Sequence, residues 1–305
     1  MTSLASIPAV CDVIHVRGGD ADPQAPPDLL LEVPHGATRA ADYDALRREL
    51  RGSYPDDLQA FFFVNTDVGA PEVAAALAER FVASAPQRSA VVVRCLIPRT
   101  FVDCNRLIDA DAQPHASAAG EITPGLHAYA QDPHDRELLL RRYAAYRHAV
   151  TRAYDRVCGG GGLGLMVHSY APRSIDVPVD AEIVARLRRE YEPERITTWP
   201  LRAEVDFIVR DEAGRLLVRE DLLAAMQASC ARAGYQVAVA GTYTLHQATL
   251  AYEFAVRHAG ATLCLELRRD LLVREFTPFA EMVADPAKVA RAAEALAAAC
   301  LVAMG

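Results

Sequence analysis

The chain has 305 residues, of which 51% are hydrophobic, so it can bury a substantial core and is not expected to be disordered. Forty acidic residues against 32 Lys and Arg give a formal net charge of −8, which argues against a phosphate-binding surface and a nucleic-acid partner. Charges interrupt each apolar stretch before the roughly 20 residues that span a membrane, and the N-terminus lacks a basic start followed by a long apolar segment. A soluble, unexported protein is expected.

The seven cysteines are scattered without Cys-x-x-Cys spacing, and an odd number cannot all pair within one chain. Cys95, Cys264 and Cys300 stand in apolar surroundings. They are expected to be small core residues with reduced thiols, which is typical of a cytoplasmic protein.

The first half of the chain alternates between strand and helix patterns. Strands are expected at 28–33 and 89–97, and helices at 70–84 and 135–158. The apolar runs that precede Asp67 and Asn105 are also interpreted as strands. Four glycines at 159–162 predict a turn that leads into a strand ending at 170, because the lysine and Ser/Thr of a phosphate-binding loop are missing.

The second half continues the same alternation. Two extended stretches around a turn are expected within 205–218, strands at 235–241 and 261–267, and helices at 220–234, 250–260 and 286–304. This order predicts one α/β domain over residues 1–305, with a central, mostly parallel or mixed sheet and helices on both faces.

Active sites of such sheets gather at the carboxyl ends of the strands, where the loops converge. Polar side chains at the expected strand ends form a short set: His35, Asp67, Asn105, Arg106, His168 and Glu266. Two histidines and one carboxylate suit a catalytic zinc ion, which takes neutral imidazoles and an anionic oxygen and leaves a position open. Taken singly, each histidine could instead be a hydrogen-bonded structural residue, and Asp67 could cap a helix.

Five short motifs occur in one order along most of the chain: "EVPHGA" (32–37), "VNTDVGA" (64–70), "FVDCNR" (101–106), "LMVHSY" (165–170) and "LELRRD" (265–270). Their order resembles the N-formylglutamate amidohydrolase family. The resemblance implies a zinc-dependent hydrolase, related in fold to the zinc-dependent exopeptidases, with one zinc ion per chain. It also implies a small-molecule N-acyl amino acid, such as N-formylglutamate, as substrate.

The resemblance further implies a role for each matching residue. His35, Asp67 and His168 would hold zinc, and Glu266 would be the catalytic base. Asn105 and Arg106 would grip a substrate carboxylate, for which the planar guanidinium offers two parallel hydrogen bonds. Further candidate substrate contacts are Arg173 and His246.

Several assignments stay open. Thr38 stands where a carboxypeptidase-like His-x-x-Glu would have its acid, so the acidic ligand is Asp67 or, as the alternative, Glu32. On an extended strand, Glu32 and His35 would point to opposite faces, which favours Asp67. Glu266 could also be a structural acid paired with Arg268, which lies on the same strand face.

Two other site residues have structural alternatives. Arg106 could form an ion pair with Asp103 or Asp109 instead of binding substrate. His246 could simply lie at an exposed helix start.

Other functions remain compatible with the same residues. One is a metal-free module of the same fold that binds carboxylates. Another is an enzyme similar to metallocarboxypeptidases or deacylases that acts on another N-acyl substrate. The acyl group, the amino acid and the oligomeric state cannot be read from the sequence.

Overall fold

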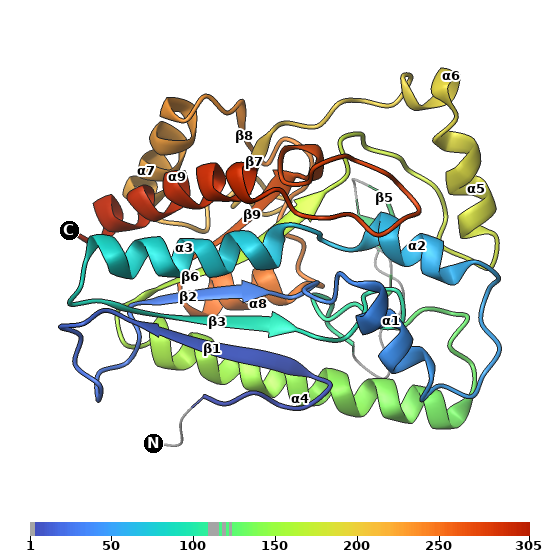
Figure 1. The fold of residues 1–305 in the computed structure, drawn as a ribbon, viewed down its shortest axis with the longest axis horizontal. Coiled ribbons are helices and arrows are strands. Elements are labelled where there is room, and N and C mark those ends of the chain that lie inside the picture. Colours follow the sequence, from blue (N-terminus) through green and yellow to red (C-terminus); the bar gives the residue numbers. More distant parts are fainter. Residues whose placement is uncertain (1–3, 109–115, 118–119, 122–123) are drawn as a thin grey trace.

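The computed structural model describes residues 4–108, 116–117, 120–121 and 124–305 (Figure 1). The strands of its main sheet are β1 (Cys11–Arg17), β2 (Leu29–Val33), β3 (Ser89–Cys95), β6 (Leu163–Tyr170), β7 (Val205–Ile208), β8 (Val237–Val239) and β9 (Thr262–Arg268). A second, two-stranded sheet pairs β4 (Ala116–Ser117) with β5 (Gly120–Glu121).

The helices lie in the connections between these strands, except α9, which follows the last strand. They are α1 (Ala40–Arg47), α2 (Leu58–Asn65), α3 (Ala70–Ser84), α4 (Pro133–Val157), α5 (Ile183–Glu190), α6 (Pro193–Ile196), α7 (Glu220–Arg232), α8 (Leu250–Arg257) and α9 (Pro286–Met304). A short 3-10 helix, η1 (Arg269–Leu271), directly follows β9.

The main sheet is mixed and has the strand order β1-β3-β2-β6-β9-β7-β8. Its four central strands, β3, β2, β6 and β9, are parallel, whereas β1 and β7 run antiparallel to their central neighbours. The carboxyl ends of β2 and β3 point toward α1 and α2 (Figure 1). Because β7 is antiparallel to β9, the chain enters β7 at this same edge, where the four central strands end.

Helices cover both faces of the sheet, as expected. Figure 1 shows α3 and α9 above the sheet and α4 below it. Side chains of α3, α7 and α9 share one buried apolar cluster with one face of the strands, and side chains of α4 and α8 share a second cluster with the other face. The predicted α/β class, with a mixed sheet between helix layers, is therefore confirmed.

Alternation along the strands decides which polar residues share a face. Leu29, Leu31 and Val33 face the α3 side, whereas Leu30 belongs to the cluster on the α4 side. By the same alternation, Glu32 on β2 points toward α4. His168 and Glu266 follow the same rule, because their neighbours Met166 and Cys264 also belong to the α4-side cluster.

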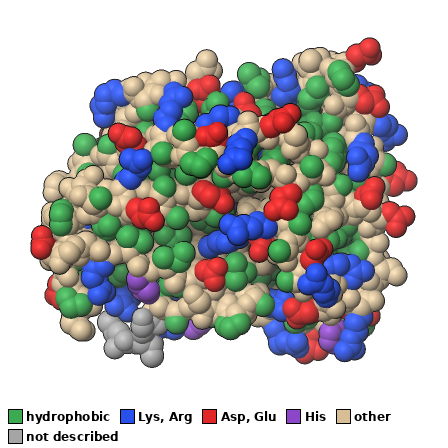
Figure 2. Space-filling model, viewed as in Figure 1, with side chains coloured by type: hydrophobic (Ala, Val, Ile, Leu, Met, Phe, Trp, Pro, Cys, Tyr) green, Lys and Arg blue, Asp and Glu red, His purple; other side chains and the backbone are tan. Residues whose placement is uncertain are grey.

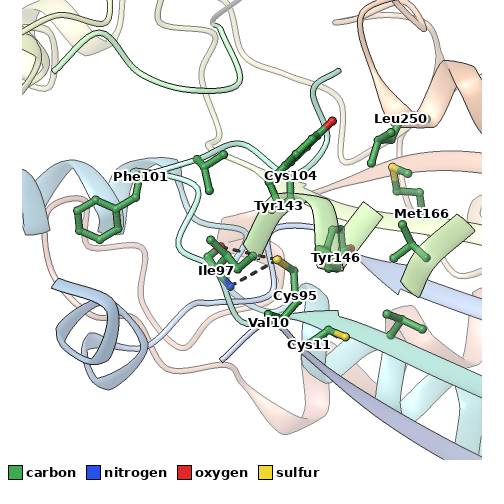
Figure 3. Packing of buried hydrophobic residues seen from close by; sticks show 14 of the residues in the cluster. Val10, Cys11, Cys95, Ile97, Phe101, Cys104, Tyr143, Tyr146, Met166 and Leu250 are labelled. Atoms are coloured by element: carbon green, nitrogen blue, oxygen red, sulfur yellow. Dashed lines mark hydrogen bonds between the residues drawn. The ribbon is translucent and has the colours of Figure 1, made fainter. Parts of the chain in front are cut away.

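The seven cysteines are all free and buried, as expected for core residues. Figure 3 shows Cys11, Cys95 and Cys104 packed among aromatic and aliphatic side chains, with the backbone N–H of Ile97 donating to the sulfur of Cys95. Among the described helices, none is long and apolar enough to cross a membrane. Acidic and basic side chains are interspersed over the face drawn in Figure 2.

The glycine run before β6 is a tight turn, as expected. Gly161 has a left-handed backbone with a φ of 89°. A Cβ on Gly162 would lie 2.4 Å from the backbone oxygen of Asp28, and one on Gly164 would lie 2.6 Å from the ring of Tyr154. The glycines therefore allow close packing between backbone segments, and between α4 and β6.

Three sequence-based expectations are wrong. The apolar run before Asp67 is helix α2, and residues 100–104 form turns with an isolated bridge at Val102. The second stretch within 205–218 contributes only isolated bridges. Residues 58–65 include three consecutive phenylalanines, and a short, fully apolar run has no periodicity that separates a buried helix from a strand.

The packing of α9 against α3 and α7 gives a stability prediction. Leu296 on α9 is fully buried in the shared cluster, so Leu296→Ala should lower the free energy of unfolding by about 2–5 kcal/mol through lost burial and a cavity. Val302 on the same helix is 68% exposed, so Val302→Ala should change it by less than about 0.5 kcal/mol. Urea denaturation measures both; equal effects would contradict the described packing of α9.

Candidate active site

Three of the expected site residues meet at the carboxyl edge of the sheet. His35 follows β2, Asp67 lies between α2 and α3, and His168 is on β6. Nδ1 of His35 lies 3.2 Å from Oδ2 of Asp67, and Nδ1 of His168 lies 2.8 Å from the same oxygen. All three side chains are buried, with at most 4% of their surface exposed.

This group, His35, Asp67 and His168, offers one ligand atom from each residue, all within 4.8 Å of one another. Burial alone would raise the pKa of the Asp67 carboxyl, but the two histidines outweigh it and hold that pKa well below its usual value. A buried anionic oxygen that faces two imidazole nitrogens is a donor set that suits a divalent zinc ion. The residues present therefore fit a metal.

Hydrogen bonds outside the group fix the backbone on both sides of Asp67. The hydroxyl of Thr66 donates to the backbone oxygen of Ala37 at 2.7 Å, which ties α2 to the chain after β2. The hydroxyl of Ser169 donates to the backbone oxygen of Val68 at 2.9 Å, which ties β6 to the start of α3. Asp67 is thus held between the two segments that carry the histidines.

Glycine is required at the start of α3. Gly69 has a φ of 90°, and a Cβ there would lie only 2.6 Å from the side chain of Leu272. This close approach of the α3 N-terminus to the chain after β9 gives a physical reason for the glycine in "VNTDVGA".

Asp103 lies behind His35 and joins it to two arginines. Its Oδ1 is 2.8 Å from Nε2 of His35, and its Oδ2 accepts from Nε of Arg99 at 3.0 Å and lies 3.9 Å from Nε of Arg106. Burial opposes ionisation of Asp103, but Arg99, Arg106 and His35 together hold its pKa well below the usual value. A carboxylate on the second ring nitrogen orients the first one, as in many metal-binding histidines.

Asn105 is positioned by the start of α8. Its backbone oxygen accepts from the N–H of Leu250 at 3.1 Å, and its side-chain oxygen accepts from the N–H of Ala251 at 3.2 Å. The amide nitrogen consequently faces His168, at 3.5 Å from Nε2. Sequence reasoning placed Asn105 at a strand end; the structure places it in a turn that α8 orients.

Glu266 lies beside His168 in the sheet, because the two residues are register partners on β9 and β6. Its other register partner is Asp206 on β7. Burial raises the pKa of Glu266 to about 7. The charge of His168 opposes this shift most strongly, Asp67 adds to it, and Arg202 and Arg99 oppose it. Its Oε2 is buried and makes no hydrogen bond to the residues that the structure describes.

The interpretation of Arg268 as the partner of Glu266 is wrong. Nε of Arg268 donates to Asp270 at 2.9 Å, and its Nη2 lies 3.6 Å from Oε1 of Glu204. The short 3-10 helix after β9 turns Asp270 back toward Arg268, which a strand pattern cannot reveal. Arg202 and Arg99 lower the pKa of Glu266, and Arg106 and Arg269 also interact with its charge.

Glu32 lies apart from the histidine group. It is fully buried and its Oε1 accepts from the hydroxyl of Tyr146 at 2.8 Å. Burial raises the pKa of Glu32 to about 7, against hydrogen bonds from Tyr146 and Tyr154. The structure thus brings Asp67, rather than Glu32, to both histidines.

The two further substrate-contact candidates lie in other hydrogen-bond networks. The guanidinium of Arg173 donates to the backbone oxygens of Thr197 and Trp199. His246 lies in the turn before α8, where its Nδ1 accepts from the N–H of Ala248, and it is buried rather than at an exposed helix start.

Arg106 and its neighbour Arg99 remain partly accessible, with 17% and 27% of their side chains exposed. The alternative ion pair of Arg106 with Asp103 is present at 3.9 Å. Asp109, the other proposed partner, lies outside the described residues. Sequence reasoning missed Arg99, although its spacing of four residues before Asp103 allows a local ion pair.

A second acid and histidine group, Asp132, His134 and Asp135, also has ligand atoms close together. Asp132 caps α4 by accepting from the N–H groups of His134 and Asp135. Asp135 accepts from the N–H groups of Arg51 and Gly52. These carboxylates are engaged by backbone donors, so this group is explained by helix capping and loop attachment.

The chain was compared with known proteins. The family model described as N-formylglutamate amidohydrolase matches residues 28–273. A solved N-formylglutamate amidohydrolase from Ralstonia eutropha JMP134 is similar, with a TM-score of 0.55 and 14% identity over 96% of this chain and 97% of that one. A gene product of Agrobacterium tumefaciens gives 0.50 and 20% identity over 96% and 94%. None of the curated proteins compared with the chain matches it.

These structural similarities concern the fold, because both identities are low. The solved structures do not test the expected relationship to zinc-dependent exopeptidases, which stays a prediction.

Asp103 gives a prediction for the cations around it. Asp103→Ala removes the carboxylate shared by Arg99, Arg106 and His35, and loss of one partner from a buried ion pair costs about 3–5 kcal/mol of unfolding free energy. Asp221→Ala breaks an exposed pair with Arg219 and should leave stability nearly unchanged. Urea denaturation of both variants distinguishes them, and a small effect at Asp103 would show that its charge does not hold this cluster.

Proposed function

The chain belongs to the N-formylglutamate amidohydrolase family, and we propose that it is a zinc-dependent enzyme that hydrolyses the amide bond of an N-acyl amino acid resembling N-formylglutamate. In this proposal, His35, Asp67 and His168 hold the metal and Glu266 is the general base. The observation that carries it is the convergence of two buried imidazoles on one carboxylate oxygen, with a second carboxylate on the neighbouring strand.

A zinc ion held by these residues would supply a Lewis acid that polarises a carbonyl group and acidifies water. The chain's own contribution begins with orientation. Asp103 on Nε2 of His35 fixes the ring so that Nδ1 faces Asp67, and the ties of Thr66 and Ser169 keep Asp67 between the histidines.

Glu266 has the properties of a proton shuttle. A general base is most effective when its pKa lies near the working pH, and burial raises the pKa of Glu266 to about 7. Its buried Oε2 makes no hydrogen bond to described residues, so none of their donors would compete with the attacking water for this oxygen. The same oxygen would take a proton from this water and then return it to the departing amine nitrogen.

Arginines supply the positive charge for an anionic substrate. Arg106 and Asn105 would bind the α-carboxylate of the amino acid, since a guanidinium can donate two parallel hydrogen bonds to it. The charge of Arg99 interacts with both Asp67 and Glu266, so Arg99 would stabilise the oxygen that becomes negative when water adds to the amide.

Metal content tests the ligand assignment. Wild-type protein purified without chelator should contain about one zinc ion per chain, and His168→Ala should lose it because one of three ligands is gone. His134→Ala, in the second acid and histidine group, should retain it. Elemental analysis measures all three proteins. Absence of zinc from the wild type, even after zinc is supplied, would overturn the mechanism and favour a carboxylate-binding module.

Catalysis tests the base. Glu266→Gln should keep its zinc but lower kcat for N-formyl-L-glutamate by about 10²–10⁴-fold, because the amide cannot accept the proton. Formate release gives the rate. Glu294→Gln, on an α9 side chain that is 73% exposed, serves as control and should match the wild type. A near wild-type rate for Glu266→Gln would remove this residue from the base role, and an inactive zinc-loaded wild type would reject the proposed substrate.

A further inference from the structure

Arg202 precedes β7 and is held firmly at the carboxyl edge of the sheet. Its backbone N–H donates to the oxygen of Pro172 at 2.9 Å, and its backbone oxygen accepts from Nη1 of Arg268 at 3.1 Å. Three residues later, β7 begins its register with β9, where Asp206 pairs with Glu266. These backbone hydrogen bonds therefore fix the position of Arg202 close to β9, the strand that carries Glu266.

Two aromatic rings clamp the guanidinium of Arg202. Its central carbon lies 5.0 Å from the ring centre of Tyr170 and 5.3 Å from that of Tyr243. Nη2 also donates to the hydroxyl of Tyr243 at 2.6 Å. Tyr243 follows Gly241 and Thr242, whose N–H groups donate to the carboxylate of Asp206. Stacking and the anchored loop thus set the plane of the guanidinium.

Among the described residues, Arg202 lacks an acid in direct contact, although its charge acts on Glu266. Its other side-chain hydrogen bonds go to the backbone oxygen of Ala171 and the hydroxyl of Ser174, and it forms no ion pair with the residues that the structure describes. Its Nε is buried without a hydrogen-bond partner among them. Because this Nε is buried, an incoming ligand would have to bind the part of the Arg202 side chain that remains exposed.

The other arginines near the site differ from it. Arg99 and Arg106 share the charge of Asp103, and Arg268 pairs with Asp270. Arg269 donates to backbone oxygens and is only 2% exposed, so it is out of reach of a substrate. Arg202 is half-buried, and its charge acts on Glu266.

The sheet order separates Arg202 from the other two site arginines. Arg99 and Arg106 follow β3, whereas Arg202 precedes β7, and β2, β6 and β9 lie between these strands. His168 and Glu266 are on β6 and β9, between the strands that carry the two sets of cations. Tyr243, which contacts Arg202, also interacts electrostatically with Arg99 and Arg106, so all three arginines border one site. A substrate with two carboxylates would direct one to Arg106 and the other to Arg202.

We propose that Arg202 binds the side-chain carboxylate of a dicarboxylic N-acyl amino acid and determines the preference of this enzyme for acidic substrates. This inference rests on the proposed amide hydrolysis and on Arg106 binding the α-carboxylate. Arg202 thereby selects a glutamate-like side chain over its neutral isostere. Only the carboxylate carries the negative charge that can form an ion pair with this guanidinium.

The test compares N-formyl-L-glutamate with N-formyl-L-glutamine, which has nearly the same shape and no side-chain charge. Wild-type enzyme should favour the glutamate derivative in kcat/KM, and Arg202→Gln should reduce this preference by at least about tenfold, mainly through KM for the acidic substrate. Arg202→Lys should keep part of it. Arg210→Gln, at the far end of β7 and exposed, is the matched control and should leave both rates unchanged.

Two results would overturn the assignment. An equal loss of kcat/KM for both substrates in Arg202→Gln would show a purely structural role. An unchanged preference would show that another residue binds the side-chain carboxylate. Calorimetric binding of L-glutamate against L-glutamine separates this inference from the proposed reaction. If the wild type binds glutamate selectively through Arg202 but hydrolyses neither substrate, the proposed function fails and the binding assignment stands; if binding does not discriminate, the assignment fails.

Discussion

The buried carboxylate of Asp67 is the constraint on which the rest of the site depends. A charge with 2% exposure survives only beside compensating groups, and here both neighbours are imidazoles on other segments. The ends of β2 and β6 and the start of α3 must therefore meet within hydrogen-bond distance of one oxygen. Arg269 adds a further tie, because it donates to the backbone oxygens of Val64 on α2 and Ser169 on β6. The same contacts therefore position the site residues and dock α2 and α3 on the sheet.

The pleat of the sheet then divides the acids into different roles. Glu32, His168 and Glu266 share the face that looks toward α4, but they stand at different depths. Glu32 pairs in register with Met166, two residues before His168. It is buried and accepts a hydrogen bond from the hydroxyl of Tyr146. Glu266 pairs with His168 itself and reaches the edge where loops and arginines converge. Glu32 and Glu266 are the same residue type, and they differ in their position along the strand. Glu32 lies further from the carboxyl edge of the sheet than the candidate base Glu266.

The sequence predicted the regular parts of this arrangement well. Helices α3 and α9 begin and end where the apolar periodicity indicated, because each packs one face on the same cluster. Helix α2 was not predicted, because its apolar run has no helical period. Strand β1 was not predicted either, because it lies at the edge of the sheet and its buried and exposed residues do not alternate regularly along the sequence. The strand-end reasoning and the motif order selected His35, Asp67 and His168, which the structure brings together, whereas their roles and that of Glu266 stay predictions. The contacts of Arg202 could not be predicted, because Tyr170 and Tyr243 are distant in sequence and meet only in the fold.

Charge balance links the site to the fold behind it. Asp103 carries one negative charge but contacts Arg99, Arg106 and His35. Arg202 forms no ion pair with an acid in the part of the chain that the structure describes, although its charge acts on Glu266. The like charges of Arg99 and Arg106 repel each other, and a flexible scaffold would relieve this repulsion by moving them apart. The central strands prevent this, because β2, β6 and β9 are buried by helix layers on both faces. The apolar sheet therefore holds arginines and carboxylates in a fixed arrangement, which would favour the anionic substrate of the proposed reaction.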